Sequence, residues 1–439
     1  MSDNKNNWSY DAVFYQLYPL GSFGAPYAND GVQEHRLLKI KDWTEHIAAL
    51  GCNAVYFSPL FESDTHGYNT RDYFRLDARL GTNEDMKEVC GLLHSKGIKV
   101  VVDGVFNHVG RGFPYFGDVC EKRESSPYKD WFFIDFSGNS RYNDGLSYQD
   151  WEGCSDLVKL NLANPAVTEY LLNAVRFWIS EFGIDGIRLD VAYLLGTDFL
   201  EKLRSLTDSL SDDLALIGEL PYGNYRERVN DRMMHSATNY ELYNELAPAL
   251  NGGDVSRLCR LLYGQYGDGG SVTGLHLFNF ADNHDVTRAA SAIKDPLMLS
   301  IAYTFIFGAP GIPCVYYGSE WGVTGEKSDG DRGLRPAFDK PETNDLTAHI
   351  GRLARAHREL KALRYGDLSV PVMTGKQCII QRDYDGERVF IAVNIGSEPY
   401  TAHFNAGFGM AYDYVTEKFH DFGGGSLIEP MSSHIWQCR

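Results

Sequence analysis

Amphipathic helical patterns alternate along the chain with short, continuous apolar runs. In the clearest case Asn164 and Pro165 open a helix, Gly183 follows its last residue, and the run GIRLDVA (186–192) comes next. Asn and Pro are typical of helix starts and Gly of helix ends, and a continuous Val/Ile-rich run is typical of a buried parallel strand. The same order predicts helices over 40–50 and 82–96, ended by Gly51 and Gly97, and strands over 54–60 and 99–106.

Five further apolar runs bring the number of predicted strands to eight. They cover 12–20, 214–220, 238–243, 275–285 and 312–318. Strands that alternate with helices favour a parallel sheet, and eight of them favour closure into a barrel. The predicted class is therefore α/β, a (β/α)8 TIM barrel.

Two regions depart from this alternation. Residues 109–160, after the third strand, are rich in Gly, Tyr, Trp and Asp and have no helical period, so we expect an irregular insertion. From about residue 366 the helical pattern stops, and an Asp-Gly pair at 385–386 between two apolar runs predicts a hairpin. We expect a barrel over 1–108 and 161–365, an inserted domain over 109–160, and an antiparallel β domain over 366–439.

Net charge, apolar segments and cysteine spacing indicate which partners and which cellular compartment to expect. A formal net charge of −18 argues against nucleic acid and anionic lipid as partners. No apolar stretch approaches the length of a membrane span, and the first residues contain no apolar signal segment. The eight cysteines are scattered without CxxC spacing, which is typical of reduced thiols. We expect a cytoplasmic protein with no membrane partner.

Four of the predicted strands end in carboxylates, which is where a barrel of this kind places its catalytic groups. They are Asp103 in DGVFNH, Asp190 in GIRLD, Glu219 in IGEL and Asp285 in FADNHD. A single Asp at a strand end is usually a helix cap, and a single His is usually a core residue. Four polar clusters at one end of one barrel are different, because four buried charges without a site would be costly.

Two of these carboxylates have neighbours that predict their protonation. Arg188 and Asp190 are two residues apart on a strand and point to the same side, where the arginine favours the ionised carboxylate that a nucleophile needs. Glu219, followed by Leu220 and Pro221, lies in a more apolar sequence. Close to ionised aspartates, it should keep its proton, as a general acid must.

The four carboxylate segments resemble the four signature regions of the α-amylase family, glycoside hydrolase family 13. HGYNTRDYF (66–74) and GIPCVYYGSE (311–320) are also similar to motifs of that family. The resemblance covers nearly the whole chain in the right order, including the insertion (domain B) and the C-terminal β domain (domain C).

The resemblance implies a retaining glycoside hydrolase that cleaves α-glucosidic bonds. It makes Asp190 the nucleophile, Glu219 the acid/base, and Asp285 a third carboxylate that grips sugar hydroxyls and distorts the ring; Asp103 would be structural support. Retaining hydrolysis needs two carboxyl groups about 5–5.5 Å apart. The residues implied in substrate binding are Tyr68, stacked on the sugar, His108, Arg188 and His284, hydrogen-bonded to it, and Asp331 and Arg335 in the next subsite.

Within the family, RLDVA is most similar to the cyclomaltodextrinase, neopullulanase and maltogenic amylase branch. That branch usually has an N-terminal domain, whereas here the first barrel strand is expected near residue 12. It also usually has Trp-His after the acid/base, where this chain has Leu220-Pro221-Tyr222. The implied partner is an α-glucan oligosaccharide, and a monomer and a homo-oligomer stay equally open.

Several functions are compatible with these residues. The first is a hydrolase of short maltooligosaccharides or cyclodextrins that cleaves α-1,4 bonds, with α-1,6 bonds as a second candidate. The alternatives are a transglycosylase or α-glucosidase on the same scaffold, and an endo-acting α-amylase. A catalytically dead carbohydrate-binding or interaction protein ranks last, because the nucleophile and the acid/base are both present.

No cofactor is expected, and we predict that activity survives EDTA. Secreted calcium-dependent α-amylases have a Lys-His pair after the nucleophile, and the backbone of that histidine helps to bind calcium; here Val191-Ala192-Tyr193 follows. Asn107 alone remains among the obvious ligands, and a single neutral amide holds Ca²⁺ poorly. The measurement is the hydrolysis rate before and after chelation. Inactivation that added Ca²⁺ reverses would instead reveal a calcium site built from the 109–160 insertion.

Overall fold

Eight parallel strands form a closed barrel in the computed structural model, which describes residues 7–211 and 213–439. The strand order is β13-β12-β11-β5-β2-β1-β15-β14. A parallel bridge between Thr238 and Phe278 joins the two ends of this sheet, and Asn239 N donates to Phe278 O at 2.9 Å. The predicted barrel is confirmed. Its strands are β1 (Phe14–Leu17), β2 (Ala54–Phe57), β5 (Lys99–Gly104), β11 (Gly186–Leu189), β12 (Ala215–Gly218), β13 (Ser236–Ala237), β14 (Phe278–Phe280) and β15 (Ile312–Tyr316).

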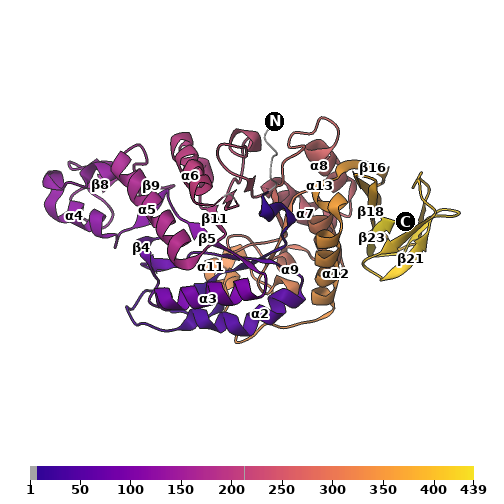
Figure 1. Cartoon of the computed structure of the whole chain (residues 1–439), viewed down its shortest axis with the longest axis horizontal. Helices are drawn as coiled ribbons and strands as arrows, with labels where there is room; N and C mark the ends of the chain where they lie inside the picture. The colour runs from indigo at the N-terminus through magenta and orange to yellow at the C-terminus, as the bar shows by residue number, and fades with distance from the viewer. Residues whose placement is uncertain (1–6, 212) are drawn as a thin grey trace.

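Amphipathic helices pack around the barrel (Figure 1). The Asn164 side chain accepts a hydrogen bond from Ala166 N at the start of α5, and Gly183 ends that helix in the left-handed conformation (φ 67°). The three helices predicted from caps and glycines are confirmed. The longer helices are α2 (Ile40–Ala49), α3 (Asn83–Ser95), α5 (Pro165–Phe182), α6 (Thr197–Leu210), α7 (Tyr240–Gly252), α8 (Ser256–Tyr266), α10 (Leu297–Gly308) and α12 (Asp345–Glu359).

The predicted sixth strand, 238–243, is wrong in its position. The strand is β13, only Ser236–Ala237, and residues 240–243 are the first turn of α7. The side chain of Asn239 caps this helix by accepting a hydrogen bond from Leu242 N. The aromatic residues of TNYELY favour a strand locally, but the buried positions Leu242 and Leu246 have helical spacing.

The insertion after the third barrel strand is more regular than expected. It contains the helix α4 (Pro114–Lys122) and a small antiparallel sheet in the order β6-β10-β9. Pro114 opens α4, and Phe116 and Val119 bury one face of it. Because α4 has only nine residues, its apolar positions repeat too few times for a helical period to be recognised in the sequence. The strands of this sheet are β6 (His108–Gly110), β9 (Asp150–Trp151) and β10 (Cys154–Lys159).

A six-stranded antiparallel sheet closes the chain at the end of the molecule opposite the insertion (Figure 1). The predicted hairpin is present, because Tyr384 pairs with Glu387 around a two-residue loop. Asp385 and Gly386 both have positive φ (48° and 81°), as this turn requires. The sheet consists of β16 (Asp367–Met373), β17 (Gln377–Tyr384), β18 (Glu387–Asn394), β23 (Ser432–Cys438), β20 (Met410–Asp413) and β21 (Lys418–Asp421).

Over 7–211 and 213–439, none of the helices combines the length and the apolar character that a bilayer crossing requires.

Candidate active site

A cavity of about 390 Å³ lies at the carboxyl ends of the barrel strands. Seven of the nine predicted site residues line it. The other two contact residues of this lining, Arg188 through Glu219 and His284 through Asp285. The insertion provides one wall through Trp151, Cys154, Asp156 and Leu157. The lining residues among the predicted set are Tyr68, His108, Asp190, Glu219, Asp285, Asp331 and Arg335.

Three carboxylates surround the guanidinium of Arg188, which is 5% exposed. Nη1 donates to Asp103 Oδ1 at 3.0 Å and to Asp190 Oδ1 at 2.8 Å, and Nη2 lies 3.0 Å from Glu219 Oε2. Strand register explains the cluster, because Arg188 pairs with Asp103 across β11 and β5. On the other side Glu219 N donates to Leu189 O at 3.0 Å, one residue before Asp190.

The charges of this cluster do not balance when every carboxyl group is ionised. Burial raises the pKa of Asp190, Glu219 and Asp103 raise it further, and Arg188 only partly offsets these effects. Arg188 favours the ionised form of Asp190, as its position in the sequence predicts, but burial and two more carboxylates outweigh its effect on the pKa. Carboxyl groups that interact this closely titrate together.

Asp285 has the opposite environment. His284 Nε2 lies 2.8 Å from Asp285 Oδ2, and Arg335 Nη2 lies 2.8 Å from Asp285 Oδ1. Desolvation alone would raise the pKa of Asp285, but His284 and Arg335 hold it below the usual range. Asp285 is therefore an ionised acceptor at the rim of the cavity, next to Asp331, which lies 3.4 Å from the same Nη2.

Three polar atoms near the cavity are buried without a hydrogen-bond partner among the described residues. They are His108 Nε2, Asp190 Oδ2 and Trp151 Nε1. The first two are 3.9 Å apart, and burial lowers the pKa of His108 to about 3, so its ring is neutral at pH 7. Buried polar groups in folded proteins are normally paired. Such a group of unpaired atoms around one cavity fits a ligand rich in hydroxyl groups.

The residue after Asp190 has a strained backbone. Val191 adopts the left-handed conformation (φ 49°), which is rare for a β-branched residue. This conformation directs Val191 N toward Glu219 Oε2 at 2.9 Å. Strain of this kind concentrates at functional sites, where surrounding contacts enforce it.

Sequence reasoning missed several groups around the site. Gln16 Nε2 contacts His284 Nδ1 at 2.8 Å, and the Tyr18 ring lies 4.5 Å from the Arg335 guanidinium carbon. A Gln within the apolar first strand is a usable signal, because a buried amide needs a partner. Asp156 gave no such signal, since the wall to which it belongs forms only when the insertion packs over the barrel. Trp151, in contrast, is one of the aromatic residues of the insertion from which a wall of the cleft was expected.

Asn107 is the one candidate calcium ligand that the sequence offers. The side-chain amide of Asn107 is buried and lies 3.1 Å from His108 Nδ1. Throughout the described ranges, no three His, Cys, Asp or Glu side chains are grouped so that they could hold a metal ion. The prediction that activity survives EDTA still depends on the chelation experiment.

Comparison with known protein families adds to this geometry. The family model described as "Alpha amylase, catalytic domain" matches residues 37–355, well over half of the chain. The chain belongs to the α-amylase family. It is accordingly an enzyme, a glycoside hydrolase, as its sequence motifs predict.

Curated members of the α-amylase family are similar along most of the chain. A cyclomaltodextrinase of Bacillus sp is 32% identical over 409 residues, which cover 88% of this chain and 73% of that protein. The intracellular maltogenic amylase of Bacillus subtilis (strain 168) is 30% identical over 328 residues, 74% of this chain and 55% of that protein. Among solved structures, the cyclic α-maltosyl-(1→6)-maltose hydrolase of Arthrobacter globiformis has a TM-score of 0.86 and 28% identity, over 99% of this chain and 100% of that one.

The charge cluster around Arg188 predicts a pH effect in this α-amylase family member. Asp103 is one of the negative charges that raise the pKa of Asp190. Replacing Asp103 with the neutral Asn should therefore lower that pKa and move the acidic limb of the kcat/KM profile to lower pH, by on the order of one unit. The matched control is Asp208→Asn at an exposed position of α6, which should leave the limb in place. An acidic limb that stays or rises in Asp103→Asn would contradict the charge balance.

Proposed function

We propose that the protein is a retaining glycoside hydrolase that cleaves α-1,4-glucosidic bonds of short maltooligosaccharides or cyclodextrins by double displacement. In this proposal Asp190 is the nucleophile, Glu219 is the general acid and base, and Asp285 grips sugar hydroxyls. Tyr68, His108, Arg188 and His284 bind the sugar next to Asp190, while Asp331 and Arg335 bind the following unit.

The observation that carries this proposal is the pair of carboxyl groups on one guanidinium. Asp190 and Glu219 each contact Arg188, through Nη1 at 2.8 Å and Nη2 at 3.0 Å, and both line the cavity. Two carboxyl groups this close suit a retaining enzyme, because an inverting enzyme needs additional space between them for a water molecule. The unpaired Asp190 Oδ2 is available to attack a sugar bound in this cavity.

The reaction then runs in two displacements. Asp190 Oδ2 attacks the anomeric carbon while Glu219 protonates the departing glycosidic oxygen, so the C–O bond breaks and a covalent glycosyl ester forms. Glu219, now ionised, removes a proton from a water molecule that attacks the same carbon. Asp190 departs as a carboxylate, Glu219 regains its proton, and the product has the original anomeric configuration.

The shape of the site favours short substrates. The cavity is walled by Trp151 and Asp156 from the insertion and by Tyr193 from the barrel. Tyr193 donates to Glu152 Oε1 at 2.9 Å, which connects the barrel to the insertion, and its ring lies 5.1 Å from that of Tyr222. The relatives named cyclomaltodextrinase and cyclic α-maltosyl-(1→6)-maltose hydrolase support a small or cyclic substrate, the second of them with an α-1,6 link.

The Tyr193–Tyr222 pair also supports the second candidate, a transglycosylase. Tyr222 is 64% exposed, so it offers a ring on which an incoming sugar can stack. In transglycosylation, Glu219 removes the proton from a sugar hydroxyl in place of water. Products longer than the substrate would identify this activity.

We also propose a reducing, intracellular setting. All eight cysteines are free thiols, and five of them are buried, Cys52, Cys90, Cys259, Cys314 and Cys378. Free buried thiols are typical of proteins from reducing compartments.

The catalytic assignment predicts different defects in Asp190→Asn and Glu219→Gln. Both should abolish hydrolysis of maltotriose, by on the order of 10⁴-fold or more, with unchanged circular dichroism. On α-glucosyl fluoride, whose fluoride leaves without protonation, Glu219→Gln should still release a burst of fluoride and Asp190→Asn should not. The control is Glu227→Gln, outside the cavity, which should keep normal rates. Substantial maltotriose hydrolysis by either active-site variant refutes the assignment.

The substrate assignment predicts a preference for small ligands. kcat/KM on maltotriose to maltohexaose and β-cyclodextrin should exceed that on amylose and soluble starch, because binding energy from a few enclosed sugar rings is available at the transition state. Proton NMR of the first products should show α-anomers. Equal or better values on the polymers would identify an endo-acting α-amylase, and β-anomers would exclude a retaining mechanism.

A further inference from the structure

The motif GIPCVYYGSE (311–320), which resembles a motif of the α-amylase family, contributes no residue to the lining of the active-site cavity. It consists of β15 and the first residues after it, at the carboxyl end of the barrel. Its two consecutive tyrosines, Tyr316 and Tyr317, are fully buried. Because buried hydroxyl groups need hydrogen-bond partners, the partners of these two tyrosines indicate what the motif supports.

The two hydroxyl groups hold the backbone on either side of Arg335. Tyr316 OH donates to Leu334 O at 3.0 Å, and Tyr317 OH donates to Pro336 O at 2.8 Å. Leu334 and Pro336 are the residues directly before and after Arg335. When the carbonyl groups on both sides of a residue are held in this way, the direction in which its side chain leaves the backbone is fixed.

Arg288 adds to this support from the segment that carries Asp285, which it follows by three residues. Its guanidinium is fully buried and donates to Leu334 O at 2.8 Å and to Tyr317 O at 2.7 Å. The guanidinium carbon also lies 4.0 Å from the centroid of the Tyr316 ring. One side chain therefore connects the segment of Asp285, the two tyrosines and the backbone at Leu334.

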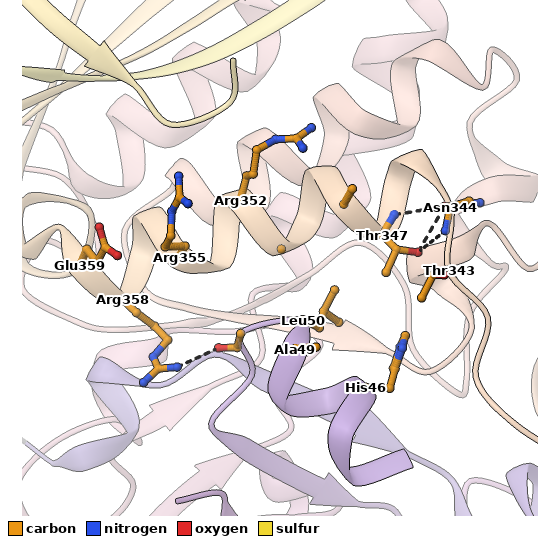
Figure 2. Close-up of a pocket in the computed structure, with 13 residues that line it drawn as sticks. His46, Ala49, Leu50, Thr343, Asn344, Thr347, Arg352, Arg355, Arg358 and Glu359 are labelled. Atoms are coloured by element: carbon orange, nitrogen blue, oxygen red, sulfur yellow. Dashed lines mark hydrogen bonds between the residues drawn. The ribbon is translucent and has the colours of Figure 1, made fainter. Parts of the chain in front are cut away.

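The last part of the motif is fixed by the first barrel strand and two outer helices. Glu320 Oε1 accepts a hydrogen bond from Tyr15 on β1 at 2.6 Å and lies 2.7 Å from His46 Nε2 on α2. Thr347 on α12 donates to Glu320 O at 2.8 Å. Figure 2 shows His46 and Thr347 at the same end of the groove between α2 and α12. These buried contacts hold the segment of the two tyrosines in place.

Arg335 is the residue whose position these contacts control, and it contacts groups assigned to sugar binding. Its Nη2 donates to Asp285 Oδ1 at 2.8 Å and lies 3.4 Å from Asp331 Oδ2, while its Nε donates to His284 O at 3.1 Å. A guanidinium presents its donors in a rigid fork. A small displacement of the Arg335 backbone would therefore disturb all these contacts together.

We propose that Tyr316 and Tyr317 are positioning residues, which act on bound sugar only through Arg335. Their hydroxyl groups hold the two carbonyl groups beside Arg335, and Arg335 in turn orients Asp285. Neither tyrosine lines the cavity, so neither touches the substrate. The inference rests on the proposed function, because it requires that Arg335 and Asp285 contact the sugar.

The test is a double-mutant cycle of kcat/KM on maltotriose, in which Tyr316→Phe/Tyr317→Phe is combined with Arg335→Gln. Phe keeps both rings and removes only the hydroxyl groups. The tyrosine double variant should lower kcat/KM by about tenfold, since a misplaced binding group costs up to about 10²-fold. In the Arg335→Gln background the same change should lower kcat/KM by less than about twofold, because the side chain that the tyrosines position is already absent.

The two single variants should differ in their effect. When the Tyr316 hydroxyl is lost, Leu334 O keeps Arg288 as a donor. Pro336 O, in contrast, has Tyr317 as its one donor among the described residues. Tyr317→Phe should therefore lower kcat/KM more than Tyr316→Phe, because it leaves a carbonyl group without a partner.

The matched control is Tyr10→Phe. Tyr10 OH also donates to a backbone carbonyl, that of His235 at 3.1 Å, but at the opposite end of the barrel strands. This variant loses the same kind of hydrogen bond and should keep the parental kcat/KM. Circular dichroism and Tm identify any variant that does not fold. If the tyrosine double variant does not fold, Tyr317→Phe alone takes its place in the cycle, with the same expected dependence on Arg335.

The outcomes separate this inference from the proposed function. Parental kcat/KM in the tyrosine double variant, or the same fold loss with and without Arg335, refutes the positioning role alone. An equal loss in Tyr10→Phe also refutes it, because the effect would then follow from any lost hydrogen bond. Parental kcat/KM in Arg335→Gln refutes the sugar-binding role of Arg335 in the proposed function and, with it, this inference.

Discussion

The guanidinium of Arg188 is the only cation in contact with Asp103, Asp190 and Glu219 within the described part of the chain, and the active site is arranged around it. Removing several charges from water is costly unless they are paired and hydrogen-bonded. One guanidinium balances only one of three ionised carboxylates. Burial and the remaining negative charge together raise the pKa of Asp190.

Strand register is what brings these charges together. Arg188 lies opposite Asp103, and Leu189 lies opposite Gly218, so the residues that follow at the strand ends become neighbours. A shift of β11 by one residue would turn Arg188 and Asp190 to the opposite side of the sheet. Closure of the barrel through Thr238 and Phe278 makes such a shift more costly, because every strand then has partners on both sides.

The insertion and the barrel contribute in different ways to the active-site cavity. The insertion adds a wall with Trp151 and Asp156 to a cavity whose reactive groups all come from the barrel.

The sequence by itself determined the barrel, the succession of helices and strands along the chain, and the carboxylates at the strand ends, because helix caps, glycines and apolar runs are local signals. The same signals failed at TNYELY, where β-favouring aromatic residues hide a helix that packing of Leu242 and Leu246 stabilises. Only the tertiary structure decided the protonation balance of Asp190, which depends on the burial and charges of residues far apart in the chain. The same holds for the contact of Gln16 with His284 and for the unpaired Trp151 Nε1. Each of these features forms where segments far apart in the chain come together, and the sequence of one segment does not indicate the other.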